Sequence, residues 1–173
     1  RYATFAGLAA LLGSLVVSAN RFLAPFERVV AFRVLPRPLD EAHGELTPKG
    51  TYRRQAVQEG FKDLIAPMYA QSHVSLALCG DGGGGLELQV PNWVLRELGA
   101  LQQDVALSSG GLRASGRRVT VERVAAGRVD ALRVGDFVYR GFGRALDLGA
   151  VLSRPALWLG NEELCAFVGE EAF

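Results

Sequence analysis

The sequence is poor in the side chains that bind transition metals or act as catalytic nucleophiles. It contains two histidines, two cysteines and one methionine in 173 residues. Cys79 and Cys165 cannot form a Cys-x-x-Cys pair, which excludes a zinc ribbon and a thioredoxin-type site. Two cysteines also exclude a small domain held by many disulfides. We therefore expect no catalytic residue, no metal site and no cofactor, and we favour a non-catalytic role over an enzymatic one.

The chain also has almost no excess of charge. Its 19 basic and 18 acidic residues give a formal net charge of +1, which excludes a strongly basic nucleic-acid-binding protein. No specific nucleic acid and no small-molecule substrate is predicted. Arginines are nevertheless concentrated in the second half of the chain, where they are candidate contacts for an anionic partner. These arginines are Arg113, Arg117, Arg118, Arg123 and Arg128.

One long segment is both uncharged and apolar. Between Arg1 and Arg21, nineteen consecutive residues carry no formal charge. A helix rises about 1.5 Å per residue, so roughly 20 such residues cross the hydrocarbon core of a bilayer. Residues 1–24 are therefore predicted to form a membrane-anchor helix. A helix buried in a protein core is the alternative interpretation.

Small residues in this segment occur in small-x-x-x-small pairs, which allow another helix to approach closely. The predicted membrane or helix-packing residues are Ala3, Ala6, Gly7, Ala9, Ala10 and Gly13. Four arginines between residues 21 and 37 follow the segment, and only Arg1 precedes it. The positive-inside tendency then places the bulk of the chain on the cytoplasmic, matrix or stromal side of an organelle membrane or a bacterial inner membrane.

An interfacial segment and linker are predicted over residues 25–50, because prolines and glycines interrupt the apolar pattern there. An α+β domain is predicted over residues 51–173. Its first element is an amphipathic helix that begins after Thr47 and Pro48 and ends at Pro67. The apolar face of this helix consists of Val57, Phe61, Leu64, Ile65 and Met68.

From residue 73 onward the hydrophobic period changes from that of a helix to that of a strand. Residues 74–79 and 86–90 are predicted to form a β-hairpin. The loop between them, residues 80–85, matches Gly-x-Gly-x-x-Gly. It leads into a strand and not into a helix, which argues against dinucleotide binding. A short helix is predicted over residues 92–98, with Gly99 in the left-handed conformation after it.

Short strands separated by turn residues are predicted for the rest of the chain, including residues 146–151, 156–159 and 164–168. The expected fold class is α+β. It comprises an N-terminal hydrophobic transmembrane helix, one amphipathic helix, and a small, mainly antiparallel β domain with one short helix.

These patterns favour a non-catalytic, single-pass accessory or assembly subunit of a larger membrane complex. Its expected partners are the other subunits of that complex and the lipid bilayer, and the α+β domain mediates protein–protein contacts. One alternative is a soluble, β-rich, oligomerising interaction module with a buried N-terminal helix. An enzyme without a recognisable motif is the other.

Overall fold

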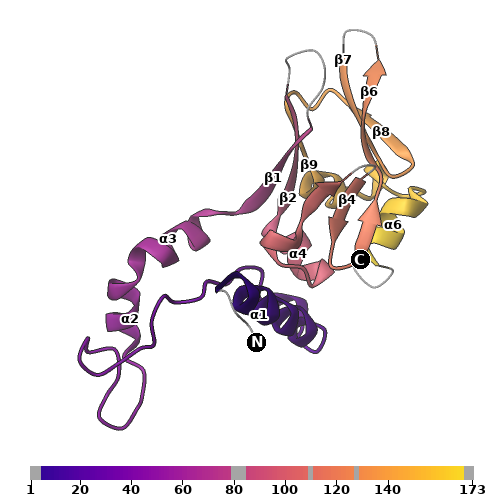
Figure 1. Ribbon diagram of the computed structural model, residues 1–173. Coiled ribbons are helices and arrows are strands. Elements are labelled where there is room, and N and C mark those ends of the chain that lie inside the picture. Colours follow the sequence, from indigo (N-terminus) through magenta and orange to yellow (C-terminus); the bar gives the residue numbers. More distant parts are fainter. Residues whose placement is uncertain (1–4, 79–84, 109–110, 127–128, 170–173) are drawn as a thin grey trace. The chain divides into compact units, whose positions relative to one another are not determined.

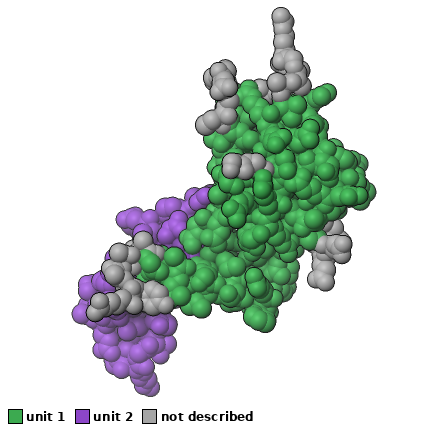
Figure 2. All heavy atoms as spheres, turned by 45° about the vertical axis from the view of Figure 1, so that its right-hand side comes forward, with its two compact units in different colours: residues 1–30, 73–173 green, residues 31–72 purple. Residues whose placement is uncertain are grey.

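A computed structural model describes residues 5–78, 85–108, 111–126 and 129–169 (Figure 1). The chain divides into two compact units, which Figure 2 distinguishes by colour. Unit 1 contains residues 1–30 and 73–173, and unit 2 contains residues 31–72. We describe each unit separately.

Unit 1 combines short helices with three small sheets. Its helical elements are α1 (Phe5–Asn20), η1 (Pro25–Glu27), α4 (Asn92–Leu98), η2 (Gln102–Asp104), α5 (Leu148–Leu152), η3 (Pro155–Leu157) and α6 (Glu162–Val168), where η marks a single 3₁₀ turn. Its strands are β1 (His73–Leu78), β2 (Leu86–Pro91), β3 (Ala106–Ser108), β4 (Gly111–Ala114), β5 (Arg117–Val119), β6 (Val121–Ala126), β7 (Val129–Val134), β8 (Phe137–Arg140) and β9 (Ala145–Asp147). The predicted α+β class is confirmed.

Each sheet has three strands among the described residues. The orders are β1-β2-β9, β3-β4-β5 and β6-β7-β8. All pairings are antiparallel except that of β9, which runs parallel to β2. The parallel strand β9 follows β2 by more than fifty residues, so this pairing joins two distant parts of the chain within unit 1.

The hairpin and short helix predicted from the sequence are confirmed. β1 pairs with β2 from His73 opposite Pro91 to Leu78 opposite Leu86. α4 covers the predicted residues, and Gly99 follows it with φ +65°, a left-handed conformation that glycine adopts without steric cost. The Gly-x-Gly-x-x-Gly loop lies outside the described residues apart from Gly85.

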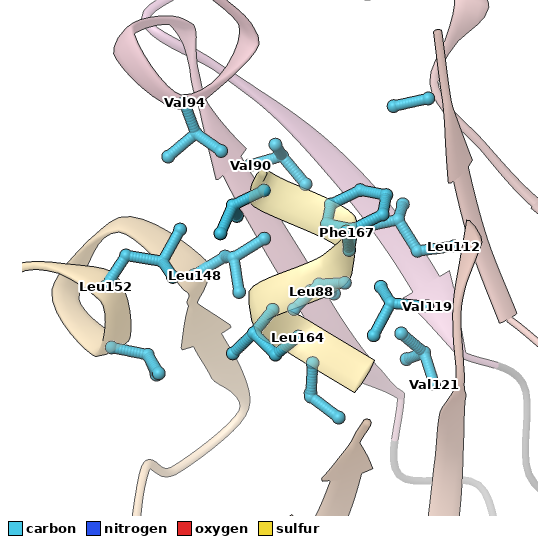
Figure 3. Packing of buried hydrophobic residues seen from close by; sticks show 14 of the residues in the cluster. Leu88, Val90, Val94, Leu112, Val119, Val121, Leu148, Leu152, Leu164 and Phe167 are labelled. Atoms are coloured by element: carbon cyan, nitrogen blue, oxygen red, sulfur yellow. The ribbon is translucent and has the colours of Figure 1, made fainter. Parts of the chain in front are cut away.

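One hydrophobic cluster joins the helices and sheets of unit 1 (Figure 3). Its side chains come from the strands β2, β4, β5, β6, β7 and β9, from the helices α4, α5 and α6, and from the segments between them. Those labelled in Figure 3 are Leu88, Val90, Val94, Leu112, Val119, Val121, Leu148, Leu152, Leu164 and Phe167. Each of them is almost completely buried, so this cluster is the core that determines the position of the surrounding loops.

The prediction of strands near the end of the chain is confirmed only for Leu146 and Asp147, which lie in β9, and it is wrong for the rest, including η3 at Pro155–Leu157. Residues 148–152 form α5, and residues 162–168 form α6. Each helix begins with a capping side chain that the sequence analysis did not use. Asp147 accepts a hydrogen bond from the Gly149 amide, and Asn161 accepts one from the Leu164 amide.

The side chain of Asn161 connects α6 to the turn between β7 and β8. Its Nδ2 donates to the Val134 carbonyl at 2.8 Å, and its Oδ1 accepts from the Asp136 amide at 3.0 Å. Asn161 is fully buried, and its side chain makes three hydrogen bonds to backbone groups. A Cβ at Gly135 would collide with Asn161 Oδ1, and Gly135 has φ +59°. The turn therefore requires glycine there.

The prediction of a transmembrane N-terminal helix is not supported. α1 spans sixteen residues and ends at Asn20, whose side chain bonds back to Val29. In the described part of the chain, no helix has both the length and the apolarity needed to cross a membrane.

Unit 2 contains two short helices, α2 (Arg54–Gly60) and α3 (Lys62–Ala70), in place of the single amphipathic helix that the sequence predicts. Thr47 does not begin a helix, because its Oγ1 accepts the Thr51 amide within a turn. Phe61, the buried residue of the predicted apolar face, lies at the break between α2 and α3. Pro67 lies inside α3 and does not end it.

Candidate functional site: an arginine-lined cavity

A cavity of about 340 Å³ lies within unit 1 between the end of α1, the end of α4 and the turn from β4 to β5. We call it the arginine cavity. Its volume lies within the roughly 300–1,000 Å³ of typical small-molecule sites. Its lining residues are Asn20, Arg21, Arg28, Glu97, Leu98, Gly99, Ser115 and Arg117.

Residues 20–29, which we call the aromatic loop, provide one wall of this cavity. Asn20 closes the loop: its Oδ1 accepts from the Val29 amide at 3.0 Å, and its Nδ2 donates to the Val29 carbonyl at 2.8 Å. Asn20 is buried. Because a buried amide that is bonded at both ends has a single orientation, Asn20 holds the two ends of the loop together.

Arg28 joins the aromatic loop to α4. Its Nε donates to the carbonyls of Asn20 and Leu23 at 3.1 and 3.0 Å. Its Nη1 donates to the carbonyls of Arg96 and Glu97, both at 2.8 Å. The last carbonyls of a helix carry partial negative charge, so a guanidinium is a favourable partner for them. Arg28 is thus held in place by the protein before any ligand binds.

Arg117 reaches the cavity from the opposite side. Its Nη1 donates to the carbonyls of Phe167 and Val168 at 3.0 and 2.7 Å, at the end of α6. Ser115, in the turn before β5, has φ +50°, the conformation that a two-residue hairpin turn with Gly116 requires. The turn and the fixed guanidinium together form a rigid wall.

The charge of the cavity lining is positive. Arg21, Arg28 and Arg117 contribute three guanidinium groups, and Glu97 contributes one carboxylate. Guanidinium groups bind phosphate and carboxylate through paired, charge-assisted hydrogen bonds. Two of the three are already positioned by carbonyl contacts, which lowers the entropic cost of binding. The arrangement is suited to a small anion, and phosphate esters are such anions.

A second, larger cavity adjoins the first and shares Arg21 and Ser115 with it. Its volume is about 740 Å³. One side is the face of α1 that carries Ala10, Gly13 and Ser14, and the other is formed by β3 and β4, including Arg113. A ligand held in the arginine cavity therefore has space to extend along α1.

The structure separates the five arginines that the sequence groups as anionic contacts. Arg113 and Arg118 lie opposite each other on β4 and β5 and are exposed. Arg117 lies in the arginine cavity, Arg123 is half-buried on β6, and Arg128 lies outside the described residues. That these arginines contact an anionic partner stays a prediction.

The predicted helix-packing residues are only partly brought together. Ala10 and Gly13 line the larger cavity, and Gly13 is buried. Gly7 and Ala9 are half-buried on α1. Ala3 lies outside the described residues, and of Ala6 only its place in α1 is described.

The sequence analysis missed Asn20, Arg21 and Arg28 as site residues. It used the two arginines only to orient a membrane helix. A possible signal was the Asn-Arg pair that directly follows an uncharged segment, because asparagine readily bonds to nearby backbone where a helix ends. No local pattern in the sequence indicates that Arg28 contacts α4, because its partner Arg96 lies 68 residues further along the chain.

Unit 2 contains a separate group of ionisable side chains, Asp40, His43 and Glu45, whose ligand atoms lie within 4.8 Å of one another. Glu45 is only 2% exposed, and both of its carboxylate oxygens accept from Arg37, at 2.6 and 2.8 Å. This pairing lowers the pKa of Glu45. His43 lowers the pKa of Asp40 through hydrogen bonds from its backbone and its ring.

The guanidinium of Arg37 pairs with both oxygens of Glu45 and lies 3.7 Å from Asp40, so this cluster is better explained as an ion-pair network than as a metal site. Arg37 also stacks over Phe61, with 5.3 Å between its Cζ and the ring centroid. The network therefore joins the segment before α2 to the break between α2 and α3.

Comparison with protein families shows a match to part of the chain. The C-terminal domain of AMP-binding enzymes matches residues 6–73, which is less than half of the chain. No curated protein and no solved structure matches this chain. The matched residues include α1, Asn20, Arg21 and Arg28, and thus one wall of the arginine cavity.

This match contradicts the interpretation of the chain as a non-catalytic, single-pass membrane subunit. It points to a domain of an enzyme family, and it includes most of the residues that the sequence analysis assigned to a membrane anchor. The terms membrane and accessory subunit find no support in the fold or in the family match. The hydrophobicity of residues 5–20 misled the prediction, because an apolar helix is compatible with several environments.

Proposed function

We propose that this chain acts as a nucleotide-binding domain of an enzyme related to the AMP-binding family, and that the arginine cavity binds the phosphate of a nucleoside monophosphate. The observation that carries the proposal is the convergence of three guanidinium groups on a cavity one wall of which lies within the family match. Arg28 and Arg117 are held by backbone carbonyls and Arg21 is exposed, so a phosphate would contact two fixed donors and one adjustable donor.

The size of the cavity supports the same proposal. About 340 Å³ is at the lower end of the range for small-molecule sites, which suits a mononucleotide. The adjoining space along α1 leaves room for a group attached to the phosphate. Glu97 lies at the end of α4 and offers a carboxylate acceptor to a hydroxyl or amino group of the ligand.

Isothermal titration calorimetry of the full chain with AMP and with adenosine tests the proposal. We expect adenosine, which lacks the phosphate, to bind at least about tenfold more weakly, because hydrogen bonds to a charged group contribute about 1.5–3 kcal/mol. Arg21→Ala is expected to weaken AMP binding by about tenfold for the same reason. It should leave adenosine binding unchanged.

Arg140→Ala is the matched control. Arg140 is exposed on β8, so this substitution removes the same charge at a position outside the cavity. Its AMP affinity should equal that of the unmodified chain. Equal affinities for AMP and adenosine, or an Arg21→Ala chain that binds AMP normally, would contradict the proposal.

A further inference from the structure

The aromatic loop holds two phenyl rings in solvent although its backbone is fixed. Phe22 is 90% exposed and Phe26 is 80% exposed. Burying a phenylalanine side chain is worth about 1.5–3 kcal/mol, so a loop free to rearrange would turn these rings inward. Both rings stay outside because the conformation of the loop is determined by other groups.

Hydrogen bonds account for this rigidity. Asn20 closes residues 20–29 through two bonds to Val29, and Arg28 binds two carbonyls within the loop. Glu27 Oε2 accepts the Ala24 amide at 3.2 Å, and the Glu27 amide donates to the Ala24 carbonyl at 2.8 Å. The loop therefore presents its aromatic side chains in a preorganised form.

The helix before the loop is only partly covered. Of residues 7–20 in α1, only Gly13 and Asn20 are buried. Leu8 and Leu15, which are two helical turns apart and therefore share a face, are exposed at 39% and 55%. One continuous stretch of chain thus exposes leucines along a helix and then phenylalanines in a fixed loop.

The charges along this stretch indicate what covers it. α1 carries no charged residue, and Glu27, the one acidic residue between residues 5 and 30, is bonded back into its own loop. Arg21 adjoins Phe22 and is exposed. An apolar surface beside arginine complements the acyl chains and anionic headgroups of a lipid surface. An acidic protein groove would bind the arginine but would not require such extensive apolar exposure.

We propose that α1 and the aromatic loop bind peripherally to an anionic lipid surface, with Phe22 and Phe26 inserted at the level of the headgroups and Arg21 paired with lipid phosphates. The helix lies along the surface and does not cross it. Phenylalanine and leucine on the apolar side, with arginine on the polar side, are typical of a helical segment that lies in the membrane–water interface. Arg21 belongs to both proposed sites, but neither phenylalanine lines the arginine cavity, so the phenylalanine variants test this inference separately from nucleotide binding.

Co-sedimentation with vesicles tests the inference. The full chain is incubated with vesicles of phosphatidylcholine alone and of phosphatidylcholine mixed with phosphatidylserine. We expect binding to the mixed vesicles, and a loss of at least about tenfold in the partition coefficient for the double variant Phe22→Ser, Phe26→Ser. Arg21→Ala should reduce binding to the mixed vesicles by about fivefold and leave binding to pure phosphatidylcholine unchanged.

Leu159→Ser is the matched control, because Leu159 is a 64% exposed apolar residue of unit 1 outside this stretch. It should bind vesicles like the unmodified chain. All variants should unfold at the same urea concentration, since the replaced side chains are exposed. No binding to mixed vesicles, or unchanged binding of the double variant, would overturn the inference. So would self-association in sedimentation velocity that the double variant abolishes without any vesicle binding, because the covering partner would then be a second copy of the chain.

Discussion

The helices α1 and α6 illustrate two different ways in which an apolar helix is placed in this protein. α6 has seven residues, and it buries Leu164, Phe167 and Val168 in the core of unit 1. α1 has sixteen residues and a much more apolar sequence, yet only Gly13 and Asn20 are buried among residues 7–20. The shorter and more charged helix is the one that the core covers.

The difference lies in how side chains at the helix ends are used. Asn161 fixes the first turn of α6 to the turn after β7, and Arg117 binds the last carbonyls of the helix. The attachments described for α1 lie at its C-terminal end, where Asn20 bonds to Val29 and Arg28 donates to the Asn20 carbonyl. Apolar content alone therefore does not predict burial, since the helix covered by the core is the one bonded to its neighbours at both ends.

Truncation of one leucine in each helix gives the largest expected contrast. Leu164→Ala should lower the free energy of unfolding by about 3 kcal/mol, because it leaves a cavity in a core position with no exposed surface. Leu15→Ala, the matched substitution in α1, should change it by less than about 0.5 kcal/mol. Urea denaturation followed by circular dichroism measures both. Comparable losses would show that α1 is covered within the isolated chain.

Removal of the two buried asparagine side chains compares the attachments themselves. Asn161→Ala should cost about 2 kcal/mol, because it leaves a carbonyl and two amides without their buried partner. Asn20→Ala should cost about 1 kcal/mol, since it releases a loop at the surface and not the core. The urea midpoint of unfolding measures both losses. The control is Glu162→Ala, at an exposed position in α6, for which we expect a change in the free energy of unfolding near zero. A larger loss for Asn20 would reverse the comparison.

The smallest expected effect concerns the C-terminal end of α6. Arg117→Gln removes hydrogen bonds to the Phe167 and Val168 carbonyls and should cost about 1 kcal/mol. Arg113→Gln makes the same change of charge at an exposed position on β4 and should be neutral. Thermal unfolding of both variants in parallel measures the difference. Equal melting temperatures for the two variants would show that net charge, and not the hydrogen bonds from Arg117, stabilises the C-terminal end of α6.

Elements with strong local signals were predictable. The alternation of Leu86, Leu88 and Val90 indicated a strand with one buried face, and all three residues are buried. Pro91 before α4 and Gly99 after it marked both ends of that helix. In each case the signal depends on residues within a few positions of the element, which is why sequence was sufficient.

Elements whose signals are short were not predictable in the same way. Residues 164–168 are apolar enough to pass for a strand, and only Asn161 before two glutamates indicates a helix start. In unit 2, Thr47 and Pro48 have the form of a helix start, but the chain turns there and Glu45 binds Arg37. A five- or seven-residue helix gains little from propensity alone, so its surroundings decide whether it forms.

The amino-acid sequence by itself determined the α+β class, the hairpin with its following helix, and the presence of an uncharged apolar segment before Arg21, because each depends on local spacing of apolar and turn residues. Only the tertiary structure decided where that segment ends and which arginines line the same cavity. Arg28 and Arg117 are 89 positions apart, and each is held by carbonyls from a distant part of the chain. Such placement depends on the folded backbone, and no local pattern encodes it.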